Sequence, residues 1–279
     1  MTKRKQGALR RYPWICIPRM EMLLAEIRGE LADAEHSEDK PIIVLSGPTG
    51  IGKTALLREL AFRITSEAKK PRSHDPHFRF KPFVHAVLST GAGPAQVAID
   101  IRLCMGLPTA TSHYRVAQHK TKEGLEQLSA TVLAVDHVNS ILNHGVRSQE
   151  DCLNVLKYLS VTAAIPIVLA GTMQPEAMFT HLNDPAGEME GRAVYFRMDH
   201  WQPNADFQRL LIALGEAYGL DDPEELAGEE FASLIYKRSA GLTRPVCRGI
   251  RKAARLAREE GCSLQLRHFE VAFAQMRPC

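Results

Sequence analysis

Short apolar runs recur along the first two hundred residues, and amphipathic segments separate them. The runs are four to six residues long and rich in valine, isoleucine and leucine, which is typical of buried strands. We expect strands at residues 42–45, 83–88, 131–135, 165–170 and 193–197. Strands that alternate with helices predict a parallel α/β sheet with right-handed crossovers.

Helical spacing of apolar residues accounts for most of the rest of the chain. One helix precedes the first strand, and others lie between the strands. After Trp201 the strand patterns stop and only helical patterns follow. The predicted helices cover residues 17–35, 53–68, 94–105, 113–128, 149–163, 203–218, 228–239, 244–260 and 267–277. The order predicts an α/β core followed by an all-helical appendix.

The clearest motif joins the first strand to the helix after it. It fits G-x-x-x-x-G-K-[ST] at every defined position and has an apolar strand before it and a helix after it. The motif consists of Gly47, Pro48, Thr49, Gly50, Ile51, Gly52, Lys53 and Thr54. Glycines let backbone N–H groups approach phosphate oxygens closely, and the helix N-terminus adds its positive end.

The last two residues of this loop predict a nucleoside triphosphate with magnesium. Lys53 would reach the β- and γ-phosphates, and Thr54 would offer its hydroxyl to Mg²⁺. A plain glycine-rich turn is the competing interpretation. The complete pattern in its strand–helix context favours ATP binding.

A second acidic position follows the third predicted strand. Asp136 comes directly after the apolar run 131–135, at the carboxyl end where ligands bind in open α/β sheets. It would orient the Mg²⁺ shell, although an isolated aspartate here could simply cap the next turn. Thr172 ends the fourth strand and is either a sensor of the γ-phosphate or part of a strand-terminating turn.

Several motifs, in their order and spacing, resemble the TniB/TnsC family of AAA+ transposition regulators, which are related to MuB. The similarity covers about residues 14–273. The motifs are Ile17-Pro18-Arg19, the stretch from Val135 to Leu142, the helix segment 154–159, the strand 165–172, Trp201 and Gly241-Leu242-Thr243-Arg244. The resemblance implies an AAA+ P-loop NTPase with a parallel five-stranded sheet flanked by helices and a small all-helical C-terminal lid. It divides the chain into an N-terminal basic arm and helix (1–40), a nucleotide-binding core (41–201) and the lid (202–279).

The same resemblance implies a function. The protein would form an ATP-bound ring or filament on duplex DNA and recruit or activate a transposase, with a targeting protein of the same transposon as a further partner. Arg244 would occupy the sensor position of the lid. Arg192 is the candidate for an arginine that reaches into the site of a neighbouring subunit.

One departure from the family affects catalysis. The family places glutamate after the strand-end aspartate to polarise the attacking water, and this chain has His137. Imidazole can act as a base near neutral pH, but it differs in shape from a carboxylate. Three interpretations stay open. The first is an ATPase that is reset by hydrolysis, and the second is an ATP-binding scaffold that hydrolyses poorly. Another AAA+ protein, such as a helicase loader, is a third.

Candidate DNA contacts are less specific. The resemblance to the TniB/TnsC family places the DNA-facing elements between the second and third strands. The preferred surface is therefore the helix beginning near residue 113, with Arg115, Lys120 and Lys122. A row of arginines in the helix 244–260 also shares one face, but a solvated basic face is the favoured interpretation for most of these residues. No aromatic residues are interleaved with these cations, so DNA contacts would be to the backbone and sensitive to salt.

Composition adds three constraints. The apolar content of 45%, the charged content of 24% and the net charge of +3 are ordinary for a soluble globular protein. The six cysteines show no C-x-x-C spacing, which disfavours a zinc or redox motif and suits a reducing compartment. No apolar run is long enough for a signal peptide or a membrane span, so we expect a cytoplasmic protein.

Overall fold

The computed structural model describes residues 14–71, 78–108, 113–172, 179, 187 and 189–276. The chain divides into two compact units. The sheet unit comprises residues 23–47 and 53–198, and the helical unit comprises residues 1–22, 48–52 and 199–279. The division therefore runs through the loop motif 47–54, whose residues 48–52 belong to the helical unit.

The five predicted strands form one parallel sheet, which lies in the sheet unit. Its order is β2-β3-β4-β1-β5. Strand β1 (Ile42–Ser46) pairs with β4 (Ile167–Ala170) on one side and with β5 (Ala193–Arg197) on the other. Strand β3 (Val132–Asp136) lies between β4 and β2 (Phe83–Val87). The predicted parallel five-stranded sheet is confirmed.

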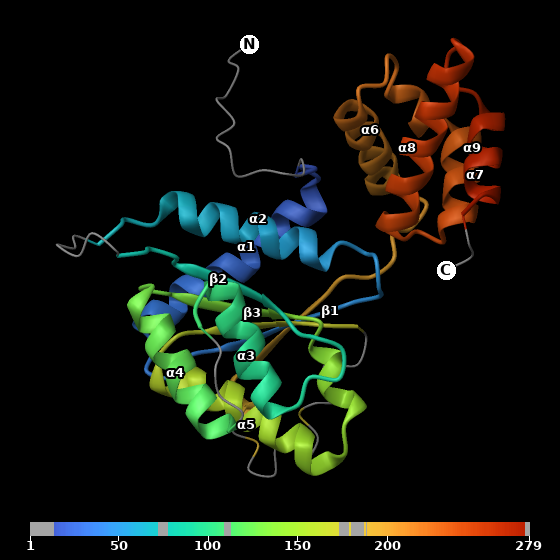
Figure 1. The fold of residues 1–279 in the computed structure, drawn as a ribbon. Helices are drawn as coiled ribbons and strands as arrows, with labels where there is room; N and C mark the ends of the chain where they lie inside the picture. The colour runs from blue at the N-terminus through green and yellow to red at the C-terminus, as the bar shows by residue number, and fades with distance from the viewer. Residues whose placement is uncertain are drawn as a thin grey trace. The chain divides into compact units, whose positions relative to one another are not determined.

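The burial of the strands follows from their position in the sheet. Every residue of β1, β3 and β4 is buried, as expected for central strands covered on both faces. Strand β5 is at an edge and stays partly exposed. Alternate residues of β1 point to opposite faces, and Ile42 and Val44 enter the hydrophobic core that the sheet shares with the helices below it in Figure 1.

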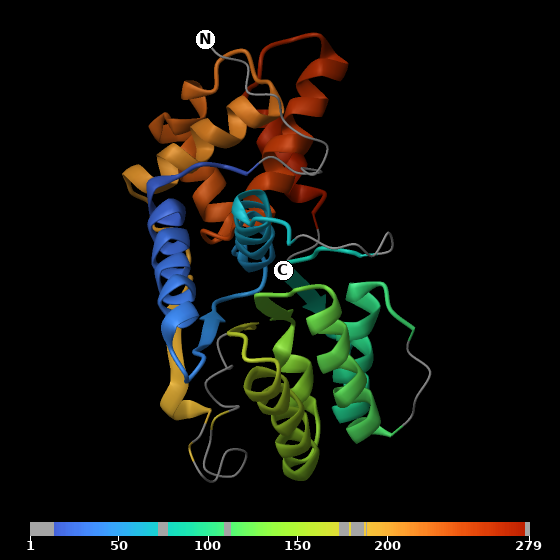
Figure 2. The same cartoon turned by 90° about the vertical axis from the view of Figure 1, so that its left-hand side faces the viewer.

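Helices cover both faces of the sheet. Figures 1 and 2 show α3 (Pro94–Met105), α4 (Tyr114–Gln127) and α5 (Val146–Thr162) side by side on one face. Helix α2 (Lys53–Glu67) covers the other face. Helix α1 (Pro18–Asp33) precedes β1, and its residues from Leu23 onward belong to the sheet unit.

Helix α5 begins earlier than the sequence pattern predicts, at Val146 rather than at Gln149. Gly145 is its extended N-terminal neighbour. The Gln149 amide nitrogen donates to the carbonyl oxygens of Leu142, at 3.2 Å, and His144, at 2.6 Å. Gln149 thus ties the first turn of α5 to the preceding 3₁₀ segment, a local contact that apolar periodicity does not register.

The C-terminal region is all helical, as predicted. The helical unit contains α6 (Ala205–Tyr218), α7 (Glu229–Ser239), α8 (Thr243–Glu260) and α9 (Leu266–Ala274). Its core is built from aromatic and aliphatic side chains, among them Phe207, Leu211, Phe231, Ile235, Ile250, Phe269 and Phe273. Within the described ranges, none of the helices has both the length and the apolar character that a membrane span requires.

Candidate functional site

Three chain segments meet at the carboxyl edge of the parallel sheet. Ala170 of β4 pairs with Leu45 on one side and with Asp136 on the other. Gly47 therefore leaves β1 beside the end of β4, and the end of β3 lies one strand further away. Because parallel strands end at the same edge, the residues predicted at 47, 136 and 172 come to lie at one edge of the sheet.

Two hydrogen bonds join the start of α2 to this edge. The Thr54 hydroxyl donates to Asp136 Oδ2 at 2.6 Å. The Lys53 ammonium donates to the Gly47 carbonyl oxygen at 2.6 Å, across the base of the loop. Asp136 is 1% exposed and Lys53 is 9% exposed. A buried ammonium, a hydroxyl and a buried carboxylate thus lie within one small region.

The environment of Asp136 keeps it ionised. Burial raises the pKa of its carboxyl. The neighbouring His85 imidazole, the Thr54 hydroxyl and the His137 backbone N–H, which donates at 2.8 Å, together outweigh burial, so the pKa lies below the usual aspartate value. An ionised carboxylate beside a hydroxyl is an oxygen donor pair of the kind that Mg²⁺ prefers.

His85 is a site residue that the sequence pattern does not reveal. It stands in the middle of β2, in an apolar run that reads as an ordinary buried strand. Its Nε2 lies 3.8 Å from Asp136 Oδ2, which is too long for a hydrogen bond. This nitrogen is buried and has no hydrogen-bond partner among the described residues. His85 comes near Asp136 because β2 pairs with β3, and this pairing is not visible in the local sequence pattern.

His137 follows Asp136 in an unusual backbone conformation. Its φ of +63° is in the left-handed region, which residues other than glycine adopt uncommonly. The residue is exposed. Among the described residues, no group forms a hydrogen bond with its imidazole. A general base is normally held in place by a third group, and the described part of the chain provides none for His137.

Asn139 holds the end of β4. Its side-chain Oδ1 accepts a 2.8 Å hydrogen bond from the backbone N–H of Thr172. Asn139 lies within the stretch from Val135 to Leu142 that resembles the TniB/TnsC family. In the structure it fixes the main chain at Thr172, the predicted sensor position.

In the helical unit, the middle of the loop contacts the start of α8. The Arg244 backbone N–H donates to the Gly50 carbonyl oxygen at 2.8 Å, and the Thr243 hydroxyl donates to the Ile51 carbonyl oxygen at 2.7 Å. Gly50 has φ +85°, and a Cβ there would lie 3.0 Å from Arg244 Cβ. The predicted loop residue and the predicted sensor arginine are therefore direct neighbours.

Trp201 supports this arrangement. Its indole Nε1 donates to the Thr243 hydroxyl at 2.9 Å, and its backbone N–H donates to the Gly241 carbonyl oxygen at 3.0 Å. Gly241 has φ +70°, and a Cβ there would lie 2.3 Å from the Trp201 carbonyl oxygen, so a side chain does not fit. The Arg19 guanidinium lies 5.1 Å from the centre of the Trp201 ring.

Arg192 lies at the amino-terminal ends of the strands, opposite the carboxyl edge. It comes directly before β5, whose first residue Ala193 pairs with Ile42 at the beginning of β1. Four residues of strand, roughly 13 Å, separate that end from the carboxyl edge. Arg192 therefore does not join Asp136 within one chain. Arg197, by contrast, pairs with Ser46 at the carboxyl edge.

The three predicted DNA-contacting cations of α4 do not all lie on one face of the helix. Arg115 and Lys122 are seven residues apart and nearly aligned, whereas Lys120 points roughly 140° away from Arg115. Lys122 is paired with Glu126 at 2.7 Å. Arg115 and Lys122 thus share one face of α4, and Glu126 partly neutralises the charge of Lys122.

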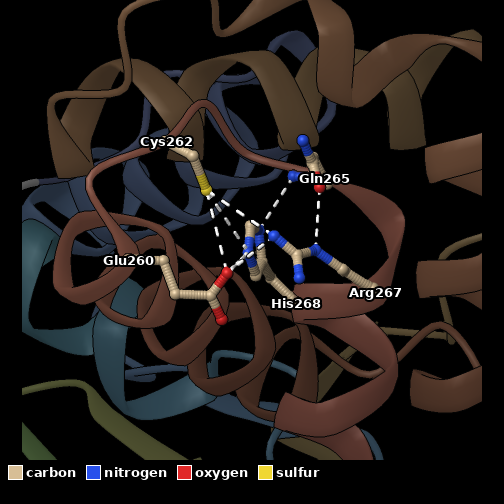
Figure 3. A network of polar contacts seen from close by, with 5 residues as sticks. All are labelled: Glu260, Cys262, Gln265, Arg267 and His268. Carbon is tan, nitrogen blue, oxygen red and sulfur yellow. Dashed lines mark hydrogen bonds and ion pairs between the residues drawn. The ribbon is translucent and has the colours of Figure 1, made fainter.

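A second polar cluster joins the end of α8 to α9 (Figure 3). Glu260, Cys262 and His268 bring their donor atoms within 4.8 Å of one another. His268 Nδ1 accepts the Gln265 backbone N–H at 3.0 Å, so Nε2 carries the proton and donates to Glu260 Oε2 at 3.2 Å. The Arg267 guanidinium also pairs with Glu260, at 2.7 Å.

This cluster is better suited to capping a helix than to binding a metal. A protonated Nε2 has no lone pair for a metal ion, and the guanidinium adds a positive charge. Hydrogen bonding from His268 and the charge of Arg267 lower the pKa of Glu260. The group therefore works as a polar link at the N-terminus of α9, where Gln265 and His268 form a capping box.

The sequence model of the family described as Bacterial TniB protein matches residues 5–203, well over half of the chain. The chain belongs to the TniB family. The matched segment contains the whole loop 47–54, Asp136 and Trp201. No curated protein sequence matches this TniB-family chain.

Solved structures extend the likeness to the fold of nearly the whole chain. Aeropyrum pernix ORC2, in ADPNP–ADP complexes, matches with a TM-score of 0.66 and 16% identity over 97% of this chain and 72% of its own. Aeropyrum pernix ORC1 in complex with DNA matches with a TM-score of 0.66 and 17% identity, over 94% and 66%. Domain III of Thermotoga maritima DnaA, a replication initiation protein, matches with a TM-score of 0.58 and 14% identity, over 93% and 92%. At these identities the likeness shows the fold alone, which is the AAA+ P-loop ATPase fold.

Proposed function

We propose that this TniB-family protein is a cytoplasmic, ATP-dependent regulator of DNA transposition. In the ATP-bound state it would oligomerise on duplex DNA and recruit or activate a transposase. The observation that carries the proposal is the 2.6 Å hydrogen bond between Thr54 and Asp136 beside the buried Lys53, in a chain of the TniB family.

The residues present fit a magnesium nucleotide. The loop has three glycines with positive φ, Gly47, Gly50 and Gly52, which free the main chain to turn its N–H groups toward phosphate. Lys53 supplies a charge for the phosphates, and Thr54 with Asp136 supplies oxygen donors for Mg²⁺. Magnesium at this position would neutralise phosphate charge. The similar ORC2 structure contains ADPNP and ADP, which supports the same ligand class here.

We propose that turnover is slow. The imidazole of His137 is exposed and has no orienting partner among the described residues. A positioned base contributes roughly 10²–10⁴-fold to a rate, and an unpositioned one contributes much less. Binding of the nucleotide, rather than its hydrolysis, would therefore control assembly. Thr172 and Arg244 are the proposed sensors of the nucleotide. Arg192 is the proposed arginine that reaches into the site of a neighbouring subunit.

Duplex DNA is the proposed partner because of the family and because the similar ORC1 structure contains DNA. Arg115, Lys120 and Lys122 remain proposed contacts, with Arg115 and Lys122 on one face and Lys120 on another. The transposase and a targeting protein of the same transposon complete the proposed set of partners.

Negative-stain microscopy tests the proposal. The wild-type protein is mixed with a non-hydrolysable ATP analogue and Mg²⁺, with and without duplex DNA, and Lys53→Ala serves as the control. We expect rings or filaments on DNA with wild type and none with Lys53→Ala. Monomers under all conditions would contradict the proposal. Assembly without DNA affinity, together with binding to a replicative helicase, would favour a helicase loader.

A further inference from the structure

The exposed face of helix α8 carries a row of cations. Arg248, Arg251, Arg255 and Arg258 follow one another at intervals of three and four residues, and all four are exposed. The opposite face is buried in the helical unit through Val246, Ile250, Ala253, Ala254 and Ala257. The sequence alone leaves open whether such a row binds a ligand or is merely solvated.

The structure adds a hollow to this row. Arg248, Arg251, Lys252 and Arg255 line a hollow of about 360 Å³ together with Met276. None of the described residues that line it is acidic. Four cations around one recess concentrate positive potential there and attract an anionic ligand.

The cations are positioned but hardly neutralised. Among the described residues, Arg255 is the member of the lining that has a carboxylate partner, Glu259 at 3.5 Å, and both side chains are more than half exposed. Such a pair is weak in water. The Arg251 guanidinium lies 6.0 Å from the Tyr218 ring, and Arg258 donates to the Tyr218 carbonyl oxygen at 3.0 Å. Tyr218 thus steadies two members of the row without cancelling their charge.

The helix that presents the row is held firmly. Gly249 lies against Phe273 of α9 so closely that a Cβ would lie 2.5 Å from the ring. Cations on a rigid helix lose less conformational freedom on binding than cations on a loop. The packing of Gly249 against Phe273 therefore fixes the backbone that carries the row.

We propose that this row binds the phosphodiester backbone of duplex DNA. From Arg248 to Arg258 the helix rises roughly 15 Å, which is longer than a single small anion requires. Duplex DNA presents one charge per ~1.7 Å of its axis, whereas an acidic protein strand presents at most one per ~3.3 Å. Guanidinium groups match phosphate oxygens in a forked geometry. The described residues that line the hollow include no aromatic ring, so contacts are to the backbone and not to the bases.

The inference rests on the DNA association in the proposed function, but it requires no nucleotide. The test therefore uses the full chain without ATP and Mg²⁺. Fluorescence anisotropy of a labelled duplex is measured over a range of salt concentrations for wild type and for the variant Arg248→Gln, Arg251→Gln, Arg255→Gln. A matched control removes the same charge from α6 and α7, as Arg209→Gln, Lys237→Gln, Arg238→Gln.

Each lost phosphate contact lowers the slope of log affinity against log salt by roughly 0.9. We expect the α8 variant to lose between two and three units of slope and roughly tenfold or more in affinity at about 0.1 M salt. The control variant should keep the wild-type slope within about one unit. Circular dichroism checks that both are folded. If the triple variant does not fold, Arg248→Gln and Arg255→Gln alone should each lower the slope by roughly 0.9.

An α8 variant with the wild-type affinity and slope would overturn the inference, and so would a wild-type chain that binds no DNA at low salt without nucleotide. Unchanged DNA binding with loss of transposase binding would assign the row to a protein partner instead. Failure of ATP-dependent assembly with a reduced slope in the α8 variant would contradict the proposed function and leave this surface standing.

Discussion

The Thr54 hydroxyl donates a 2.6 Å hydrogen bond to Asp136, although the two residues are 82 positions apart in the chain. The bond connects the first turn of α2 with the end of β3. It holds two oxygen donors together in the folded chain before any ligand arrives. Preorganisation of this kind lowers the cost of binding a metal–nucleotide complex.

Replacing Thr54 tests this bond through stability. Thr54→Val keeps the shape and removes the donor to a buried carboxylate, so the free energy of unfolding should fall by about 1.5–3 kcal/mol at neutral pH. Thr54→Ser should cost less than half of that. Urea denaturation followed by circular dichroism measures both.

The same pair predicts a pH dependence. The lowered pKa of Asp136 means that its carboxylate stabilises the fold fully above the ordinary aspartate value, about 3.9, and loses this effect as the pH falls through the lowered value. The gap between wild type and Thr54→Val should therefore be complete at about pH 7 and shrink below about pH 4. A gap that widens in acid would contradict the assignment of the bond.

Gly50 should not tolerate a side chain. Its φ of +85° and the 3.0 Å approach of a Cβ to Arg244 Cβ predict that Gly50→Ala destabilises the chain by about 1–3 kcal/mol and weakens nucleotide binding. Gly29→Ala in α1 is the matched control, because a Cβ there meets nothing within 4 Å. It should stabilise the chain by up to about 1 kcal/mol. Equal effects of the two changes would contradict the strain at Gly50.

His137→Glu should raise ATP turnover. A carboxylate after Asp136 restores the group that the family uses to polarise water, and we expect a rise of roughly 10-fold to 10⁴-fold in steady-state phosphate release. His137→Ala should leave the low wild-type rate nearly unchanged. A loss of turnover in His137→Ala to the level of Lys53→Ala would show instead that the imidazole is a working base.

Cys152 should resist alkylation while the chain is folded. Burial, with a smaller contribution from the charge of Asp151, raises the pKa of its thiol to about 12, so almost no thiolate exists at pH 8. Cys16 is exposed and should react first. Iodoacetamide labelling followed by peptide mass spectrometry distinguishes the two, and labelling of Cys152 at the rate of Cys16 would contradict its burial.

Much of the fold could be predicted because its signals are local. The strand runs are short, apolar and separated by helical patterns, and the order of elements determines a parallel sheet. The loop 47–54 could be predicted because its motif is contiguous and directly follows an apolar strand. Asp136 could be predicted because it directly follows another apolar strand.

The remaining features depend on contacts between distant residues. His85 lies beside Asp136 only because β2 pairs with β3, and Asn139 reaches Thr172 across 33 positions. Neither contact produces a hydrophobic periodicity that could be recognised in the sequence. The separation of Lys120 from Arg115 and Lys122, by contrast, follows from helical geometry and could have been recognised from their numbering alone.

Binding of a fluorescent ATP analogue to purified protein, with and without Mg²⁺, tests the central claim most directly. Wild type should bind the analogue more tightly with Mg²⁺, Lys53→Ala should lose most of the affinity, and Asp136→Asn should lose the magnesium dependence. No binding by the folded wild-type chain, or equal binding by all three proteins, would contradict the account.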